Sequence, residues 1–286
     1  MTQLDQSTTP LPTAPRRVFR LPIGLLLSAA AAILFAVALF WPSVLATHDP
    51  YALNLTHALH APSFEFLFGT DESGRDLYSR VIYGTGLSLS IGLGATAVSI
   101  TLAVILGSIA ALAGRFAAGT VNRMIEILFA FPTLLLALLI VAILGPSVMS
   151  QILAVGIGTA PGYARIIRGQ ILSAKGSGYV EAATALGHSR GLILRQHILP
   201  NALRPLVAII TLSVGQSIVW ASGLSFLGLG VAPPSPEWGA LLDAGKTYIT
   251  QAWWLTVIPG LVIVAVALSA TTLGKYLQNA IEKGEK

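Results

Sequence analysis

Five long segments of the chain contain no Asp, Glu, Lys or Arg, and they predict where it crosses a membrane. They are Leu21–His48, Val81–Gly114, Ile127–Ala164, Pro205–Pro236 and Thr247–Gly274. Because roughly 20 apolar residues span a bilayer, the 38 residues of the third segment are enough for two helices. Gly145-Pro146, near its middle, is a turn signal. We therefore expect six helices, at about Leu21–Leu45, Leu87–Ala113, Ile127–Leu144, Ser147–Ala164, Leu206–Gly230 and Trp254–Leu273.

The distribution of positive charge favours six helices over five. Short loops rich in Lys and Arg stay on the cytoplasmic side of a membrane. With six helices and a cytoplasmic N-terminus, only three of the 17 Lys and Arg lie outside, namely Arg75, Arg80 and Lys246. Five helices would place the six basic residues between Arg165 and Arg204 outside. We predict that both termini are cytoplasmic.

Composition excludes a soluble globular protein. Hydrophobic residues make up 54% of the chain and charged residues 10%, against about 25% charged residues in ordinary soluble domains, and the mean hydropathy is +0.76. The chain has no cysteine, which excludes disulfides and thiolate metal sites. The first apolar segment is longer than the 7–15 residues of a signal peptide's apolar region, so we expect a retained helix. The expected organisation is a disordered cytoplasmic tail (1–20), a first transmembrane helix (21–46), an external segment (47–80), a core of five transmembrane helices (81–279) and a cytoplasmic tail (280–286).

No motif in the sequence has all the residues that catalysis, cofactor binding or metal binding requires. Gly245-Lys246-Thr247 lacks the first glycine of a phosphate-binding loop, because Ala240 stands at that position. His57 and His60 have no third ligand for a metal. Glu126 is the only acid near hydrocarbon depth, whereas a proton-coupled carrier places ionisable groups deeper in its helices. We expect no enzyme activity and no cofactor in this chain.

The longest cytoplasmic loop, 165–204, has the pattern of a docking element. Tyr179–Leu186 consists of good helix formers with small residues on one face. Gly187 permits a turn, and a second apolar stripe, Leu192–Leu199, follows until Pro200 is expected to stop the helix. An amphipathic helix lying on the membrane surface is the alternative. Small residues beside the lone acid Glu181 suit a partner's groove better.

Four blocks of sequence resemble a known family. Glu181-Ala182-Ala183, Gly187 and His197-Ile-Leu-Pro200-Asn201 resemble the EAA loop of bacterial ABC-importer permeases, with His197 where isoleucine is usual. Leu224–Gly228 and Pro233–Gly239 match the dipeptide/oligopeptide/nickel branch. The fourth block resembles the signature of its C-type permease subunit and contains Gly69, Thr70, Asp71, Gly74, Arg75, Asp76, Ser79 and Arg80. Together the blocks extend over residues 65–275.

This resemblance implies a fold and a set of partners. The fold is an all-α membrane protein, the type I (MetI-like) importer permease with six transmembrane helices and a cytoplasmic EAA coupling loop. The implied partners are a second, B-type permease subunit in a heterodimer, two ABC ATPase subunits that bind ATP and Mg, an external substrate-binding protein and the bilayer of the bacterial inner membrane, with no nucleic acid. The coupling loop would use Tyr179, Glu181, Ala182, Ala183, Gly187, Pro200 and Asn201.

The expected substrate is a di- or oligopeptide. The family also transports nickel and other small solutes, and a secondary carrier is a more remote alternative. Polar residues in the expected helices could line the passage or could only bond neighbouring helices; they are Gln151, Ser213, Gln216, Ser217 and Ser222. Asp71, Arg75, Asp76 and Arg80 are expected to pair with one another and brace the start of the second helix.

Overall fold

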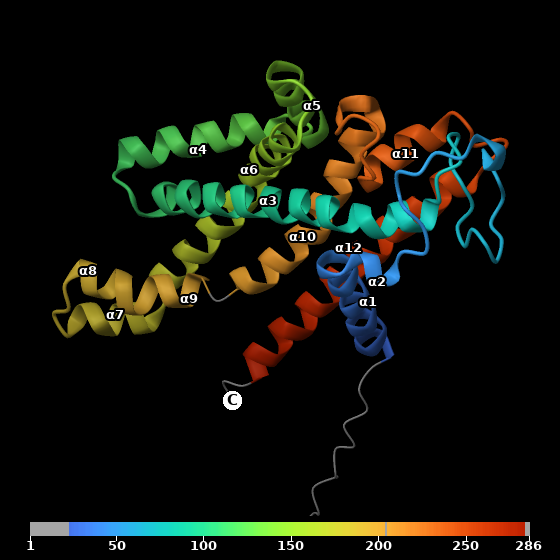
Figure 1. The fold of residues 1–286 in the computed structure, drawn as a ribbon. Helices are drawn as coiled ribbons and strands as arrows, with labels where there is room; N and C mark the ends of the chain where they lie inside the picture. The colour runs from blue at the N-terminus through green and yellow to red at the C-terminus, as the bar shows by residue number, and fades with distance from the viewer. Residues whose placement is uncertain (1–22, 204, 284–286) are drawn as a thin grey trace, which may run out of the picture.

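A computed structural model describes residues 23–203 and 205–283, and the described chain is helical without a β-strand (Figure 1). This confirms the expected all-α architecture. The long helices are α1 (Ile23–Phe40), α3 (Leu77–Leu112), α4 (Arg115–Ala130), α5 (Thr133–Leu144), α6 (Val148–Lys175), α10 (Leu206–Leu224) and α12 (Trp254–Lys283). The short ones are α2 (Pro42–Leu45), η1 (Leu55–His57), α7 (Gly178–Ala185), α8 (Arg190–Ile193), α9 (Leu199–Leu203), α11 (Trp238–Lys246) and two π-helical segments, η2 (Leu194–Ile198) and η3 (Ser225–Leu229).

Small residues let the long helices approach one another closely. A side chain at Gly107 of α3 would come within 2.8 Å of the backbone oxygen of Ala164 on α6. A side chain at Gly156 of α6 would come within 2.7 Å of Val98 on α3. A side chain at Gly215 of α10 would come within 2.9 Å of the backbone oxygen of Ala267 on α12. Close backbone approach at small residues is how helices pack in a membrane, where the hydrophobic effect gives no drive for their association.

The expected total of six membrane-spanning helices is not confirmed. Four described helices are long and apolar enough to cross a membrane: Ile23–Phe40, Leu77–Leu112, Leu206–Leu229 and Trp254–Ala280. The bent pair of α4 and α5 makes a fifth if it is one span. Helix α6 has 28 residues but carries Arg165 and Arg168 and is not among the apolar helices. A sixth span at α6 stays a prediction.

Several expected helix boundaries are wrong. Helix α3 begins at Leu77 rather than near Leu87, and α12 continues past Leu273 to Lys283. The single helix expected over 127–144 is broken at Phe131-Pro132, where α4 and α5 meet at 94°. Pro132 has no backbone N–H and disfavours helical backbone in the residue before it, and Phe131 is extended at ψ 134°. Helix α6 also continues past Ala164 to Lys175, so about the first quarter of the expected cytoplasmic loop belongs to this helix. The expected break at Gly145-Pro146 is confirmed, with Gly145 at φ +80°.

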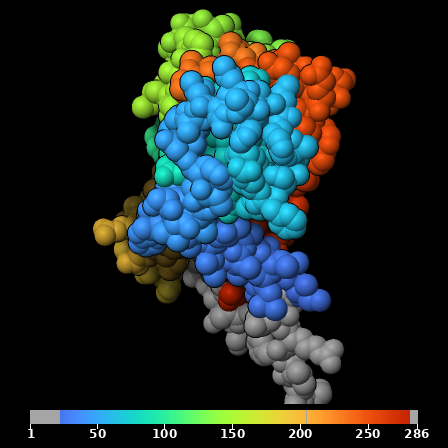
Figure 2. All heavy atoms as spheres, turned by 45° about the vertical axis from the view of Figure 1, so that its right-hand side comes forward, coloured from blue at the N-terminus to red at the C-terminus, as the bar shows by residue number. Residues whose placement is uncertain are grey.

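The helical bundle carries different structures at its two ends (Figure 1). The segment that connects α2 to α3 lies with α11 at one end, which Figure 2 brings forward, and α7, α8 and α9 lie at the opposite end. Each end has its own apolar core. At the α7 end it contains Ile167 and Ile171 of α6, and at the other end Trp238 of α11 and Trp254 of α12.

Candidate functional site

Helix α7 is held on the bundle by its buried face. Val180 and Ala183 point into the same apolar cluster as Ile167 and Ile171 of α6. Ala110 and Ala111 of α3 and Ile193 and Ile198 of the following segment belong to it as well. We call this set the inner cluster. Helix α7 contacts α8 and η2 directly and shares this cluster with α3 and α6, so displacement of α7 would reach these two long helices through the cluster.

The other face of α7 is exposed. Tyr179, Glu181, Ala182 and Leu186 are all accessible, and Glu181 lies in the first turn of the helix, where a negative charge interacts favourably with the helix dipole. An exposed Tyr and Leu beside small residues form an apolar surface with one acid on it. The residues expected to dock a partner therefore divide between this exposed face and the buried anchor, to which Ala183 belongs.

Gly187 closes α7 in a left-handed conformation. Its φ is +80°, which glycine adopts freely and other residues rarely do. The backbone N–H groups of Gly187 and His188 donate to the carbonyls of Thr184 and Ala183 at 3.0 and 3.1 Å. A side chain at this position would meet no atom within 4 Å. The requirement for glycine is therefore conformational rather than steric.

The expectation that Pro200 ends the second short helix is wrong. The helix continues from α8 through the π-helical segment η2 into α9, with Pro200 in the first turn of α9. A proline inside a continuous helix removes one backbone hydrogen bond, and the π-helical segment directly before Pro200 is the kind of local adjustment that accommodates it. The side-chain amide of Asn201 donates to the carbonyl of His197 at 2.7 Å. Asn201 therefore supplies a hydrogen bond to a backbone carbonyl of the π-helical segment η2.

The signature block at the other end forms a closed turn before α3. Asp71 accepts backbone N–H bonds from Ser73 and Arg75 at 2.8 and 2.9 Å. Its other oxygen lies 2.7 Å from Arg80 and 3.6 Å from Arg75. Asp76 caps α3 by accepting the N–H of Ser79 at 2.9 Å. Asp71 therefore pairs with both arginines, as expected, whereas Asp76 acts as a helix cap.

Glycine, threonine and serine of the same block fix the segment that connects α2 to α3. Gly69 (φ +76°) and Gly74 (φ +72°) have left-handed backbone, and a side chain at Gly74 would overlap the backbone of Asn54. The carbonyl of Thr70 accepts a bond from Trp254 at 3.2 Å. The Ser79 hydroxyl accepts the N–H of His48 at 2.9 Å. The block thus ties the segment between α2 and α3 to the first turn of α3 and to α12.

His57 and His60 lie in the segment that connects α2 to α3. His57 and His60 pack their rings against Phe66, with centroids 5.3 and 5.9 Å away. Within residues 23–203 and 205–283, no group of three or more His, Cys, Asp or Glu side chains is placed to hold a metal ion.

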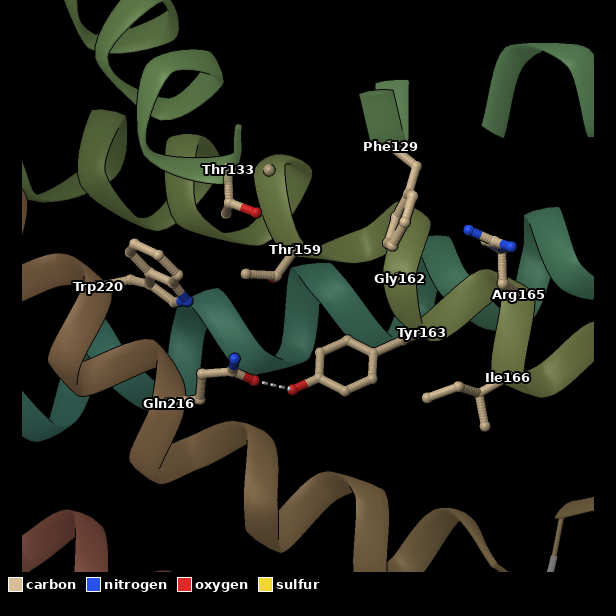
Figure 3. A pocket seen from close by; sticks show the side chains of 10 residues that line it. Phe129, Thr133, Thr159, Gly162, Tyr163, Arg165, Ile166, Gln216 and Trp220 are labelled. Atoms are coloured by element: carbon tan, nitrogen blue, oxygen red, sulfur yellow. Dashed lines mark hydrogen bonds between the residues drawn. The ribbon is translucent and has the colours of Figure 1, made fainter. Parts of the chain in front are cut away.

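A cavity of about 420 Å³ lies where α4 and α5 meet α6 and α10 (Figure 3). The break at Phe131-Pro132 places Phe129 and Thr133 around it. Tyr163 of α6 lines another side, and its hydroxyl donates to Gln216 of α10 at 2.7 Å. The rest of the lining is Gly158, Thr159, Gly162, Arg165, Ile166 and Trp220. Pro132 inside an apolar segment was the sequence signal for this bend.

Of the polar residues proposed for a passage, Gln216 alone lines this cavity. Gln151 is fully buried and donates to Ser225 at 2.6 Å. Ser217 accepts from Thr96 of α3 at 3.2 Å. Ser213 and Ser222 are buried as well. These contacts are those of helix packing, and the structure does not bring the four side chains to the cavity. The sequence analysis missed Phe129, Tyr163, Arg165 and Trp220.

Comparison with known proteins identifies the family. Residues 103–283 match the model of the family described as binding-protein-dependent transport system inner membrane component. The chain belongs to this family. It is 39% identical over 247 residues to the dipeptide transport system permease protein of Alkalihalophilus pseudofirmus, which covers 86% of this chain and 81% of that protein. It is 37% identical over 255 residues to the probable D,D-dipeptide transport system permease protein of Escherichia coli K12, covering 89% and 86%.

Solved structures agree with the family's fold. An amino acid ABC transporter crystallised with histidines superposes with a TM-score of 0.60 at 18% identity, covering 70% of this chain and 94% of that one. The methionine ABC transporter in an inward-facing conformation gives 0.58 at 18% identity, covering 70% and 95%. The expected family and its MetI-like permease fold are confirmed.

Proposed function

We propose that this chain is the permease subunit of an ATP-driven importer that carries di- or oligopeptides delivered by an external substrate-binding protein. The observation that supports this most directly is α7, whose buried face belongs to the inner cluster together with residues of α3 and α6 and whose other face is exposed. A helix held in this way can pass a push from a partner into the bundle. The names of the relatives, which are peptide permeases, support the substrate.

The partners follow from this arrangement. A second, B-type permease subunit would complete the passage, and two ABC ATPases would bind ATP and Mg and receive the exposed face of α7. Closure of the ATPases would press on Tyr179, Glu181 and Ala182. The inner cluster would pass the displacement to α6 and α3, and Pro200 and Asn201 would keep the connection to α10 stiff. Two sites that bias one bistable element are what coupling requires.

The proposed location is the bacterial inner membrane with both termini in the cytoplasm. Positive charge supports this orientation, because the α7–α9 end carries Lys175, Arg190 and Arg195 and basic segments stay inside. The signature block then lies outside, where we propose that it braces the start of α3 and the surface on which the binding protein docks.

Nickel or another small solute is a weaker proposal than peptide. Neither of the two relatives described above is named for a metal. A secondary carrier would need ionisable groups deep in its helices or an ion site. No observation favours either alternative, and peptide import is the function we adopt.

The test is uptake by the reconstituted complex carrying Glu181→Lys. A matched control is Glu126→Lys, because Glu126 is an exposed acid on α4, away from α7. We expect Glu181→Lys to assemble but to lose most of the ATP hydrolysis stimulated by the binding protein and most dipeptide uptake, while Glu126→Lys keeps both. Uptake that persists without any ATPase subunit would refute the proposal and favour a carrier.

A further inference from the structure

The cavity at the bend between α4 and α5 has a single charged residue in its wall. That residue is Arg165, and no acidic side chain lines the cavity. Its guanidinium carbon lies 4.5 Å from the centroid of the Phe129 ring. Among the described residues Arg165 makes no ion pair and no hydrogen bond. The cavity wall therefore holds a positive charge whose five N–H donors are uncommitted.

Arg165 is accessible to solvent, as expected of an arginine whose charged head reaches water at the edge of apolar surface. Here the head stacks on Phe129 at one end of the cavity (Figure 3). Stacking on an aromatic face leaves the edge of a guanidinium open for bidentate bonds to a carboxylate.

The remainder of the cavity suits the backbone of a short peptide. Trp220 and Thr133 lie at the end away from Arg165, and Tyr163 and Gln216 lie along one side (Figure 3). The Tyr163 hydroxyl occupies the amide oxygen of Gln216. The amide nitrogen of Gln216 and the indole nitrogen of Trp220 bond no described residue, so both can donate to a carbonyl. Aromatic walls with a few placed polar groups are typical of small-molecule sites.

We propose that this cavity is a peptide-binding subsite of the transport passage, in which Arg165 receives the terminal carboxylate of the transported peptide. The inference rests on the proposed function and adds where the membrane subunit recognises its substrate. Arg165 lies in the half of α6 that is nearer its predicted cytoplasmic end. The carboxylate would therefore meet it late in transport, after the binding protein has released the peptide.

Binding to the purified complex tests this without the binding protein. The probe is radiolabelled L-alanyl-L-alanine, and the complex contains the permease and ATPase subunits without nucleotide. We expect Arg165→Gln to weaken binding about tenfold, Arg165→Lys to weaken it less, and Arg115→Gln to leave it unchanged. Arg115 is the matched control because it is exposed at the start of α4 and does not line the cavity.

The same peptide with an amidated C-terminus identifies which group Arg165 recognises. It should bind the unmodified complex about as weakly as the Arg165→Gln complex binds the free acid, and Arg165→Gln should not weaken it further. Equal affinity of the unmodified complex for acid and amide would overturn the proposal. So would equal binding of the acid by both complexes, or no measurable binding by the unmodified one.

A second variant tests the cavity without touching its charge. A side chain at Gly162 begins 3.5 Å from the Phe129 ring, an ordinary contact, and Gly162→Leu would extend into the cavity. It should abolish dialanine binding in a complex that still assembles and still responds to the binding protein in ATP hydrolysis. Undiminished binding would place the peptide elsewhere.

Transport separates this inference from the proposed function. We expect Arg165→Gln to lower dialanine uptake per ATP hydrolysed at saturating loaded binding protein, and Arg115→Gln to leave that ratio unchanged. If the unmodified complex imports no dipeptide, the proposed function fails. If it imports dialanine and Arg165→Gln does so at the same ratio, only the subsite is wrong.

Discussion

Arg80 and Asp71 form a buried ion pair, with Nη1 of Arg80 2.7 Å from Oδ2 of Asp71 and each residue 5% exposed. Arg80 also donates to the carbonyl of Pro234 at 3.3 Å, in the connection between α10 and α11. The ion pair therefore joins the segment between α2 and α3, the first turns of α3 and a connection about 150 residues further along the chain. We infer that this pair sets the arrangement of the end of the bundle that carries α11.

Removing the carboxylate should destabilise that end strongly. Asp71→Asn leaves Arg80 buried without its anion, and loss of one partner of a buried pair typically costs about 3–5 kcal/mol. We expect a lower unfolding midpoint of the purified complex and a lower yield. Glu65→Gln, an exposed acid of the same segment, should change neither. Similar midpoints for the two variants would show that the pair contributes little.

The pairing of Asp71 with Arg75 and Arg80 could be predicted because the charges are close in sequence and precede an apolar helix. The break at Gly145-Pro146 could be predicted from turn residues alone. The bend at Phe131-Pro132 carried the same kind of signal, but apolar residues on both sides concealed it. The cavity could not be predicted, because Phe129 and Trp220 are separated in the sequence by all the elements from α5 to α9 and by most of α10. A hydropathy pattern does not specify the angle at which two helices meet.

Gly187 should be replaceable by asparagine more readily than by alanine. Its left-handed backbone costs a residue with a Cβ about 1–2 kcal/mol, and asparagine tolerates it better. Since no atom lies near the missing side chain, size should not matter. We expect Gly187→Ala to reduce hydrogen-exchange protection of α7 severalfold and to lower uptake per ATP, with Gly187→Asn intermediate. A ranking by side-chain size would contradict this explanation.

The anchor of α7 should depend on Ile171. This side chain is fully buried in the inner cluster, whereas its neighbour Leu172 is 40% exposed. Truncating a buried isoleucine to alanine costs about 2–5 kcal/mol. We expect Ile171→Ala to lower the unfolding midpoint and to speed amide exchange throughout α7, while Leu172→Ala has a small effect on both. If Ile171→Ala left exchange in α7 unchanged, α7 would not be anchored by this cluster.

Glu237 should make the stability of the protein depend on pH. Its carboxylate is 1% exposed and caps α11, accepting the N–H groups of Gly239 and Ala240 at 2.8 Å each. Burial raises the pKa of Glu237, and it outweighs the bonds from Gly239, Ser225, Ala240 and Ser88, which lower that pKa. A raised pKa in the folded state means that the folded protein binds this proton more tightly than the unfolded chain does.

The sign of the effect follows from that difference in proton binding. The stabilisation is fully present below the pKa of a free glutamate, about 4.3, and is lost as pH rises from there through the raised pKa of the folded state.

Glu237→Gln keeps an acceptor for the cap but cannot ionise. We therefore expect the unmodified protein to lose stability relative to Glu237→Gln as pH increases above about 4.3. Unfolding midpoints of the purified complex between about pH 4 and 8 measure this, with Glu65→Gln expected to follow the unmodified protein. Parallel pH profiles for the unmodified protein and Glu237→Gln would show that Glu237 has the same pKa in the folded and unfolded states.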